Sequence, residues 1–214
     1  MPMSPEPIVY IVDDDESVRL GLGALLVAKG YAALAFPSAE AFLAALPERP
    51  TGCALVDIRM PRMSGLELQS ELKRRGVRLP IVIVTGHGDV PVAVAALKAG
   101  AVDFLEKPFD GEALLAAIAE ALRIGALPQV ELPFERGAVE SRFAQLSQRE
   151  REVMDLVVAG QPNKVIAHRL KIALRTVEIH RARVMEKTGA RSLSELVRMT
   201  IWLSLAEPRP PDSG

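Results

Sequence analysis

Four short apolar segments of this chain each end in residues that can handle phosphate or a metal ion. The segments are 8–12, 53–56, 81–84 and 104–105, and they are followed by Asp13 to Asp15, Asp57, Thr85 and Glu106 to Pro108. Continuous apolar runs that alternate with helical periodicity are typical of a parallel sheet covered on both faces. Ligand sites in such sheets lie outside the carboxyl ends of the strands, so we expect these polar residues to converge.

The residue types predict phosphoryl transfer to a carboxylate. Carboxylates held close together repel one another unless a cation neutralises them, and oxygen ligands of this kind suit Mg²⁺. Asp57 is the only acid at the end of its run. We therefore expect it to accept a phosphoryl group as an acyl phosphate, while Asp13 and Asp14 hold Mg²⁺. The simpler interpretation of an acid after a strand is a helix N-cap, and we assign that role to Asp15 or Glu16.

Two further side chains complete the predicted site. Thr85 offers a neutral hydroxyl donor to a phosphoryl oxygen, and Lys107 offers a positive charge where negative charge develops during transfer. Taken singly, Thr85 fits a strand-end hydroxyl and Lys107 a solvated surface charge. Their places at the ends of separate strands favour the catalytic interpretation of both.

The pattern of elements predicts two domains. Five strands alternate with helices expected at 16–29, 38–46, 65–75, 91–99 and 111–124, and the remaining strand is 31–36. Prolines and glycines then interrupt the helical periodicity. We predict an α/β first domain over 1–125, a linker over 126–142, a helical domain over 143–205 and a disordered tail over 206–214.

Charge is distributed unevenly along the chain. Residues 1–125 hold 12 basic and 16 acidic side chains, and residues 126–214 hold 14 basic and 11 acidic ones. The segment 161–191 is the most basic part, which favours a polyanionic partner. No apolar stretch reaches the roughly 18 residues of a membrane span, and the first residues do not resemble a signal peptide, so we expect a cytoplasmic location without membrane contact.

The second domain is expected to be entirely helical. Residues 147–150 and 192–195 both fit the Ser-x-x-Glu capping box, and further helices are expected at 163–170 and 175–188. In the helix 175–188, Val177, His180, Val184 and Thr188 recur at helical spacing and should face the core.

Six motifs, in order, carry a resemblance to a known family. They are residues 12–15, 57–61, 63–65, 85–88, 104–109 and 175–181. The first five resemble a response-regulator receiver domain and the last a LuxR-type helix-turn-helix domain, a combination similar to the FixJ-type transcriptional regulators. The resemblance implies a doubly wound five-stranded parallel α/β sheet of the flavodoxin-like class, followed by a small all-α domain of four helices.

The resemblance also implies further site residues and partners. The backbone carbonyl of Arg59 would complete the Mg²⁺ shell, and Thr85 and Phe104 would form the switch that responds to phosphorylation. A sensor histidine kinase would supply the phosphoryl group, and the phosphorylated protein would form a homodimer, bind promoter DNA and contact RNA polymerase.

The outer face of helix 175–188 suits the DNA major groove. Ile179 and Ala182 can contact thymine methyl groups, and Glu178 can accept a hydrogen bond from a cytosine amine. The remaining predicted contacts border this face or bind phosphates, which sets position without reading sequence: Arg175, Thr176, Arg181, Arg183, Lys187 and Lys164. Ala173 and Leu174 precede this helix, so we expect a weak N-cap.

We therefore predict a DNA-binding response regulator phosphorylated on Asp57, and not an enzyme. One alternative is an aspartate-nucleophile phosphatase, which also forms aspartyl phosphate on a parallel sheet. Such enzymes usually carry a second acid two residues after the nucleophile, where this chain has Arg59. A second alternative is a DNA-binding regulator that acts without phosphorylation.

Overall fold

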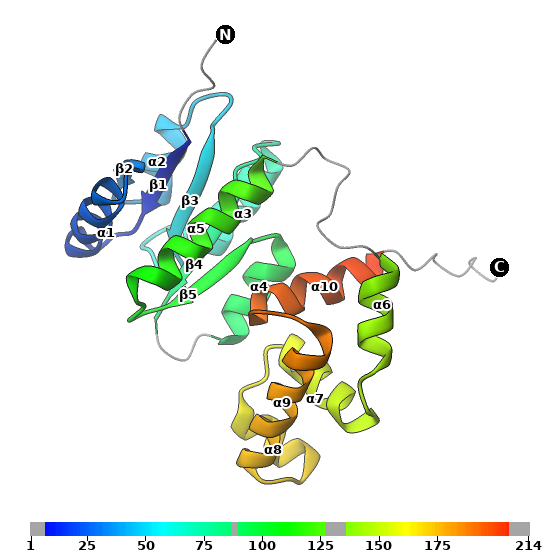
Figure 1. Ribbon diagram of the computed structural model, residues 1–214. Coiled ribbons are helices and arrows are strands. Elements are labelled where there is room, and N and C mark those ends of the chain that lie inside the picture. Colours follow the sequence, from blue (N-terminus) through cyan, green and yellow to red (C-terminus); the bar gives the residue numbers. More distant parts are fainter. Residues whose placement is uncertain (1–6, 87–89, 127–135, 206–214) are drawn as a thin grey trace, which may run out of the picture. The chain divides into compact units, whose positions relative to one another are not determined.

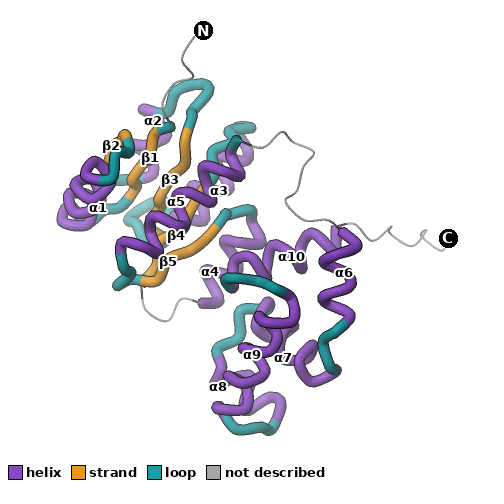
Figure 2. Tube along the Cα trace, viewed as in Figure 1, coloured by secondary structure: helices purple, strands orange, loops and turns teal. Residues whose placement is uncertain are grey.

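The computed structural model describes residues 7–86, 90–126 and 136–205. Backbone proximity divides the chain into two compact units, one comprising Met1–Asp89 and Ala99–Pro128 and the other Val90–Lys98 and Gln129–Gly214. Strands and helices alternate along residues 7–126, whereas residues 136–205 contain only helices (Figure 2). Each unit is considered separately below.

A five-stranded parallel sheet forms the centre of the first unit (Figure 1). Its strands are β1 (Ile8–Val12), β2 (Ala32–Phe36), β3 (Gly52–Asp57), β4 (Ile81–Thr85) and β5 (Asp103–Glu106), in the spatial order β2-β1-β3-β4-β5. Val12 is paired with Val56, and Asp57 with Val84. The order reverses beside β1, which is where doubly wound sheets bind ligands.

The helices that follow these strands are α1 (Glu16–Ala28), α2 (Ala39–Ala45), α3 (Gly65–Arg74), α4 (Val90–Ala99) and α5 (Gly111–Gly125). Their bounds agree with the predicted ranges to within one residue at each end. The side chain of Asp15 caps α1 by accepting from the backbone N–H groups of Ser17 and Val18, which confirms the predicted N-cap. Ser64 and Glu67 form a capping box at the start of α3 that the sequence analysis did not identify.

Helices α1 and α5 cover one face of the sheet, and their apolar side chains form the core with alternate strand residues (Figure 1). Cys53 lies fully buried in this core, and burial raises the pKa of its thiol to about 12. On the other face, the rings of Tyr10, Phe36 and Phe42 pack together, with centroids 5.4 to 6.4 Å apart. Both faces are therefore covered, as the apolar runs predicted.

Besides most of α4, the second unit contains α6 (Arg136–Ala144), α7 (Gln148–Val158), α8 (Asn163–Leu170), α9 (Leu174–Thr188) and α10 (Leu193–Leu205). The four helices predicted within 143–205 correspond to α7, α8, α9 and α10, but α6 occupies part of the predicted linker 126–142, which is a correction. Val139 and Phe143, one helical turn apart, are buried in the core of this unit and stabilise α6. A short segment with only two inward-facing apolar residues has a weak periodic signal, which explains why the helix was missed.

Ser147 and Glu150 form the predicted capping box of α7. At α10 only half of the predicted box is present: Ser192 Oγ accepts from the Glu195 N–H, but the Glu195 carboxylate accepts from the N–H of Arg191. The predicted tail and the linker residues 127–135 lie outside the described residues. Among the helices that the structure describes, none is both long and apolar enough to cross a membrane.

Candidate functional site

The predicted phosphoryl-transfer residues meet at the carboxyl ends of the strands. Asp13 follows β1, Asp57 ends β3, Thr85 ends β4 and Lys107 follows β5. Because β1 and β3 are neighbours in register, Asp13 and Asp57 lie side by side. Parallel pairing therefore brings together residues that are up to 94 positions apart in the sequence.

Lys107 joins the two carboxylates. Its Nζ donates to Asp13 Oδ2 at 2.7 Å and to Asp57 Oδ1 at 2.8 Å. The side chains of Asp13 and Asp57 are only 4% and 10% exposed, whereas that of Lys107 is 29% exposed. Two buried carboxylates thus share one ammonium group, and the three ionised groups carry a net charge of −1.

The environment of Asp57 disfavours its ionised form. Burial is the main cause that raises the pKa of the Asp57 carboxyl, and the negative charge of Asp13 adds to it; hydrogen bonding and charge from Lys107 act in the opposite direction. Asp57 Oδ2 accepts from the backbone N–H of Arg59 at 2.6 Å. Both carboxylate oxygens of Asp57 therefore accept a hydrogen bond, Oδ1 from Lys107 and Oδ2 from the backbone N–H of Arg59.

Asp13 is held by its neighbours in the chain. Its Oδ1 accepts from the N–H of Asp15 at 2.9 Å, and its backbone carbonyl accepts from Arg19 Nη1 at 2.8 Å. Arg19 is not among the site residues predicted from the sequence. Its position one helical turn into α1 gives a weak signal, since only the fold shows that its side chain reaches back to the end of β1.

Of the three predicted carboxylates, two are buried and one is exposed. Asp14 is exposed, and the described residues contain no group of three Asp, Glu, His or Cys side chains arranged to hold a metal ion. The reason is the turn after β1, because Asp15 caps α1 and Asp13 points to Lys107. The buried members, Asp13 and Asp57, form a pair of carboxylates facing one cation, Lys107.

The two predicted switch residues differ in their surroundings. Thr85 is 2% exposed, and its hydroxyl donates to the carbonyl of Gly86 at 3.3 Å. Phe104 lies in β5 and is partly exposed.

The peptide bond between Lys107 and Pro108 is cis.

Gly65 brings the start of α3 against the end of β3. Its N–H donates to the carbonyl of Ile58 at 3.0 Å. A Cβ atom at this position would lie 2.4 Å from the backbone oxygen of Asp57, a distance that real Cβ atoms do not adopt. Only glycine therefore permits this close approach beside the candidate phosphoacceptor.

In the second unit, α9 has an inner and an outer face, as predicted. Val177, Val184 and Thr188 are buried, and His180 is half-buried. The outer face consists of exposed side chains, among which Ile179 is a large apolar residue that is 45% exposed. Its other members are Arg175, Glu178, Ala182 and Arg183.

Helices α8 and α9 begin without a side-chain cap. Their N-cap residues, Pro162 and Ala173, make no side-chain hydrogen bond to the first turn, which confirms the weak N-cap expected for α9. Lys164 is exposed in the first turn of α8, and Thr176 is half-buried in the first turn of α9. Uncapped N–H groups at a helix start attract anions.

Two residues predicted to contact phosphates have partners inside the unit. Arg181 is half-buried and its Nη1 donates to Asn163 Oδ1 at 2.6 Å, while burial lowers the pKa of its guanidinium. Lys187 Nζ donates to the buried carboxylate of Glu150 at 2.6 Å and to the carbonyl of Gln145 at 3.3 Å. These two cations connect helices and are not part of the outer face, because α9 turns them toward its neighbours.

The Glu150–Lys187 pair gives the second unit a specific acid sensitivity. Hydrogen bonding to Lys187 lowers the pKa of Glu150 to about 2, below its ordinary value. Stability from this pair is therefore fully present above the unfolded pKa of about 4.3 and is lost as the pH falls toward 2. We expect urea unfolding, followed by the fluorescence of Trp202, the single tryptophan, to show this loss.

The control for this prediction is Glu150→Gln, which should be less stable than the natural protein at pH 7 and should approach it at low pH. Other acids titrate in both proteins, so the difference between them isolates the Glu150 carboxylate with its bonds to Lys187 and to the N–H of Ser147. An equal difference at every pH contradicts the prediction.

Comparisons with known proteins agree with this architecture. Residues 9–119 match the response regulator receiver domain family, and residues 144–200 match the family of bacterial regulatory proteins of the luxR type. The FixJ transcriptional regulatory protein of Azorhizobium caulinodans is 48% identical over 94% of this chain and 96% of its own length. FixJ of Bradyrhizobium diazoefficiens is 46% identical over 93% of this chain and 97% of its own length. The crystal structure of full-length FixJ from B. japonicum is 43% identical and covers 95% of this chain and 100% of its own, with a TM-score of 0.55.

The fold and the matches define a two-component response regulator with a DNA-binding domain. Within that class, the chain belongs to the FixJ-type transcriptional regulators. The receiver domain implies a sensor kinase as partner, and the LuxR-type domain implies promoter DNA. The phosphatase alternative is not favoured, because the family consists of transcriptional regulators.

Proposed function

We propose that Asp57 is the phosphoacceptor of this regulator and that a sensor histidine kinase is the donor. The observation that supports this most directly is the buried contact of Asp57 with Lys107, which also holds Asp13. During transfer, the Asp57 oxygen attacks phosphorus and the bond from phosphorus to the leaving group breaks. Lys107 neutralises charge on the phosphoryl oxygens, and the Thr85 hydroxyl donates to one of them.

The carboxylate pair suits Mg²⁺. Mg²⁺ in proteins usually binds one or two carboxylates together with waters and phosphate, and Asp13 and Asp57 form a buried oxygen pair that already attracts a cation. We propose Asp13 and Asp57 as the principal ligands, with exposed Asp14 and the backbone carbonyl of Arg59 at the edge of the site. The ion would offset the negative charge of this pair and of the incoming phosphoryl group.

The direct test is chemical. Incubating the protein with Mg²⁺ and acetyl phosphate should add one phosphoryl group, and mass spectrometry should locate it on Asp57. Label on another residue, or equal uptake when Mg²⁺ is removed with a chelator, contradicts the proposed site.

Phosphorylation is proposed to act through Thr85 and Phe104. The new acceptor oxygens favour an inward position of the Thr85 hydroxyl, which alters the packing around β5. The changed surface would support the phosphorylation-dependent homodimer, and the activated protein would contact RNA polymerase at the promoter. We assign residues 1–125 to the receiver domain and 143–205 to the DNA-binding domain, and place the protein in the cytoplasm with the DNA.

The proposed DNA surface is the outer face of α9 together with the uncapped starts of α8 and α9. Glu178, Ile179 and Ala182 would read base edges, and Arg175, Thr176, Arg183 and Lys164 would bind phosphates. Arg181 and Lys187 are excluded from this set, since their charged groups bind Asn163 and Glu150.

We expect Arg183→Ala to weaken promoter binding and to reduce the slope of log affinity against log salt by about 1, the value for one lost phosphate contact. Fluorescence anisotropy over a salt series measures both quantities. The matched control is Arg191→Ala, which removes another exposed charge that lies after α9 and pairs with Glu195. Equal slopes for the two variants would show that only net charge matters.

A further inference from the structure

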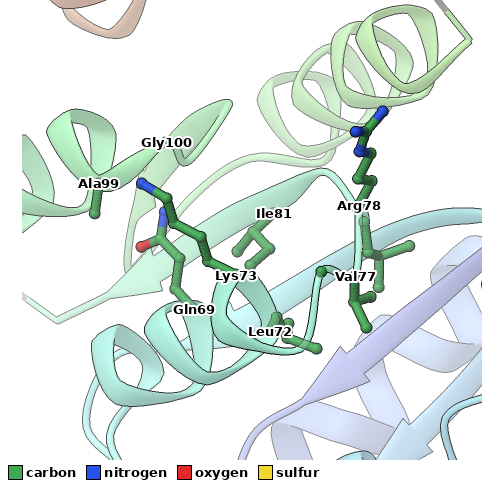
Figure 3. Close-up of a pocket in the computed structure, with 10 residues that line it drawn as sticks. Gln69, Leu72, Lys73, Val77, Arg78, Ile81, Ala99 and Gly100 are labelled. Atoms are coloured by element: carbon green, nitrogen blue, oxygen red, sulfur yellow. The ribbon is translucent and has the colours of Figure 1, made fainter. Parts of the chain in front are cut away.

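A pocket of about 380 Å³ lies at the end of the sheet opposite to Asp57 (Figure 3). It is formed where α3 ends, where β4 begins at Ile81, and at the turn that precedes β5. Its volume is within the range of small-molecule sites. The lining residues are Gln69, Leu72, Lys73, Gly76, Val77, Arg78, Leu79, Ile81, Ala99 and Gly100.

The floor of the pocket is apolar. Leu72, Leu79 and Ile81 are each less than 10% exposed. The last carbonyls of α3 already have donors, since the N–H of Val77 bonds to Leu72 and that of Gly76 to Lys73. The end of α3 therefore presents few free acceptors to a ligand.

The charged side chains of the pocket are both cations. Lys73 and Arg78 line it, and no acidic residue does. Their neighbours Arg74 and Arg75 both bind Glu71, but Lys73 and Arg78 form no ion pair within the described part of the chain. In Figure 3 the Lys73 side chain extends beside Gln69 toward Ala99, and Arg78 stands on the other side of Ile81.

We propose that this pocket binds a small organic dicarboxylate with an aliphatic middle. Two separate cations suit two separate anionic groups, and the apolar floor between them suits methylene groups. Inorganic phosphate would leave the apolar floor without a partner, and a monocarboxylate would use only one cation. This site is independent of the phosphorylation site and of its chemistry.

The test is an NMR titration of the full chain with adipate, hexanoate, hexanediol and inorganic phosphate at constant ionic strength. Adipate is expected to shift the amide signals of Gly76, Gly100 and their neighbours, and to bind several-fold more tightly than the other three compounds. Lys73→Gln and Arg78→Gln should each weaken adipate binding about threefold to fivefold, the effect expected of an exposed ion pair.

Arg74→Gln is the matched control, because Arg74 belongs to the same basic run but binds Glu71 and does not line the pocket. It should leave adipate binding unchanged, as should Asp57→Asn, which separates this proposal from the proposed phosphorylation. The proposal is overturned if the shifts are absent or spread over the surface, if phosphate or hexanoate binds equally well, or if Arg74→Gln weakens binding as much as Lys73→Gln.

Discussion

The Asp57→Asn variant is expected to lose phosphorylation and to become more stable. Asparagine has nearly the same shape but no nucleophilic oxygen, so label uptake from acetyl phosphate should fall at least about a thousandfold. Loss of function at this position does not require loss of structure. Phosphorylation is lost while stability rises because the reaction requires the negative charge of Asp57, whereas burial of that charge destabilises the folded protein.

The stability gain follows from the environment of the carboxyl. Burial raises the pKa of Asp57, so the folded protein favours the neutral form more than the unfolded chain does. The free-energy cost of burying the ionised carboxylate is absent at a pH below the pKa of Asp57 in the unfolded chain. It is fully present at a pH above the pKa of Asp57 in the folded protein. Removing the charge should therefore stabilise the receiver domain at neutral pH, and by less as the pH falls through the folded pKa toward the unfolded one. Lys107 keeps Asp13 as its partner.

Urea unfolding by circular dichroism at pH 7 and in acid measures this difference. Asp14→Asn is the matched control, since it makes the same chemical change at an exposed position and should leave the free energy of unfolding nearly unchanged. A less stable Asp57→Asn protein at pH 7 would show that the bond to Lys107 outweighs the cost of burial.

Gly65→Ala is expected to destabilise the receiver domain by about 2 to 3 kcal/mol and to slow phosphorylation. The added methyl group would lie 2.4 Å from the Asp57 carbonyl oxygen and 3.1 Å from Ile58 Cα. Both are backbone atoms, so no side-chain rotation relieves the contact. The segment between β3 and α3 must shift, and the N–H of Arg59 that holds Asp57 Oδ2 shifts with it.

Gly21→Ala makes the same change inside α1, where a Cβ atom would meet nothing within 4 Å. There the expected effect has the opposite sign, a gain of about 0.5 to 1 kcal/mol, because alanine is the better helix former. Chemical denaturation of both variants and their rates of labelling by acetyl phosphate provide the measurement. A neutral Gly65→Ala protein with normal labelling would contradict the tight packing described for this position.

Some features of this structure were predictable from the sequence and others were not, depending on whether the signal is local. Strand and helix positions over residues 7–126 were predictable because apolar runs, glycine stops and capping residues are local signals. The convergence of Asp13, Asp57, Thr85 and Lys107 was predictable as well, since parallel strands bring their carboxyl ends to one edge. Helix α6 was not, because Val139 and Phe143 become informative only when the core that buries them is known.

By itself, the sequence determined the order of elements, the residue types at the strand ends and the basic character of the second unit. The tertiary structure decided which charges are used internally: Lys107 joins Asp13 and Asp57, Lys187 binds Glu150, Arg181 binds Asn163, and Asp14 stays exposed. The physical reason is that the role of a charged side chain depends on how deeply it is buried and on which groups contact it. Those partners are set by packing between segments far apart in the chain, which local patterns of residues do not encode.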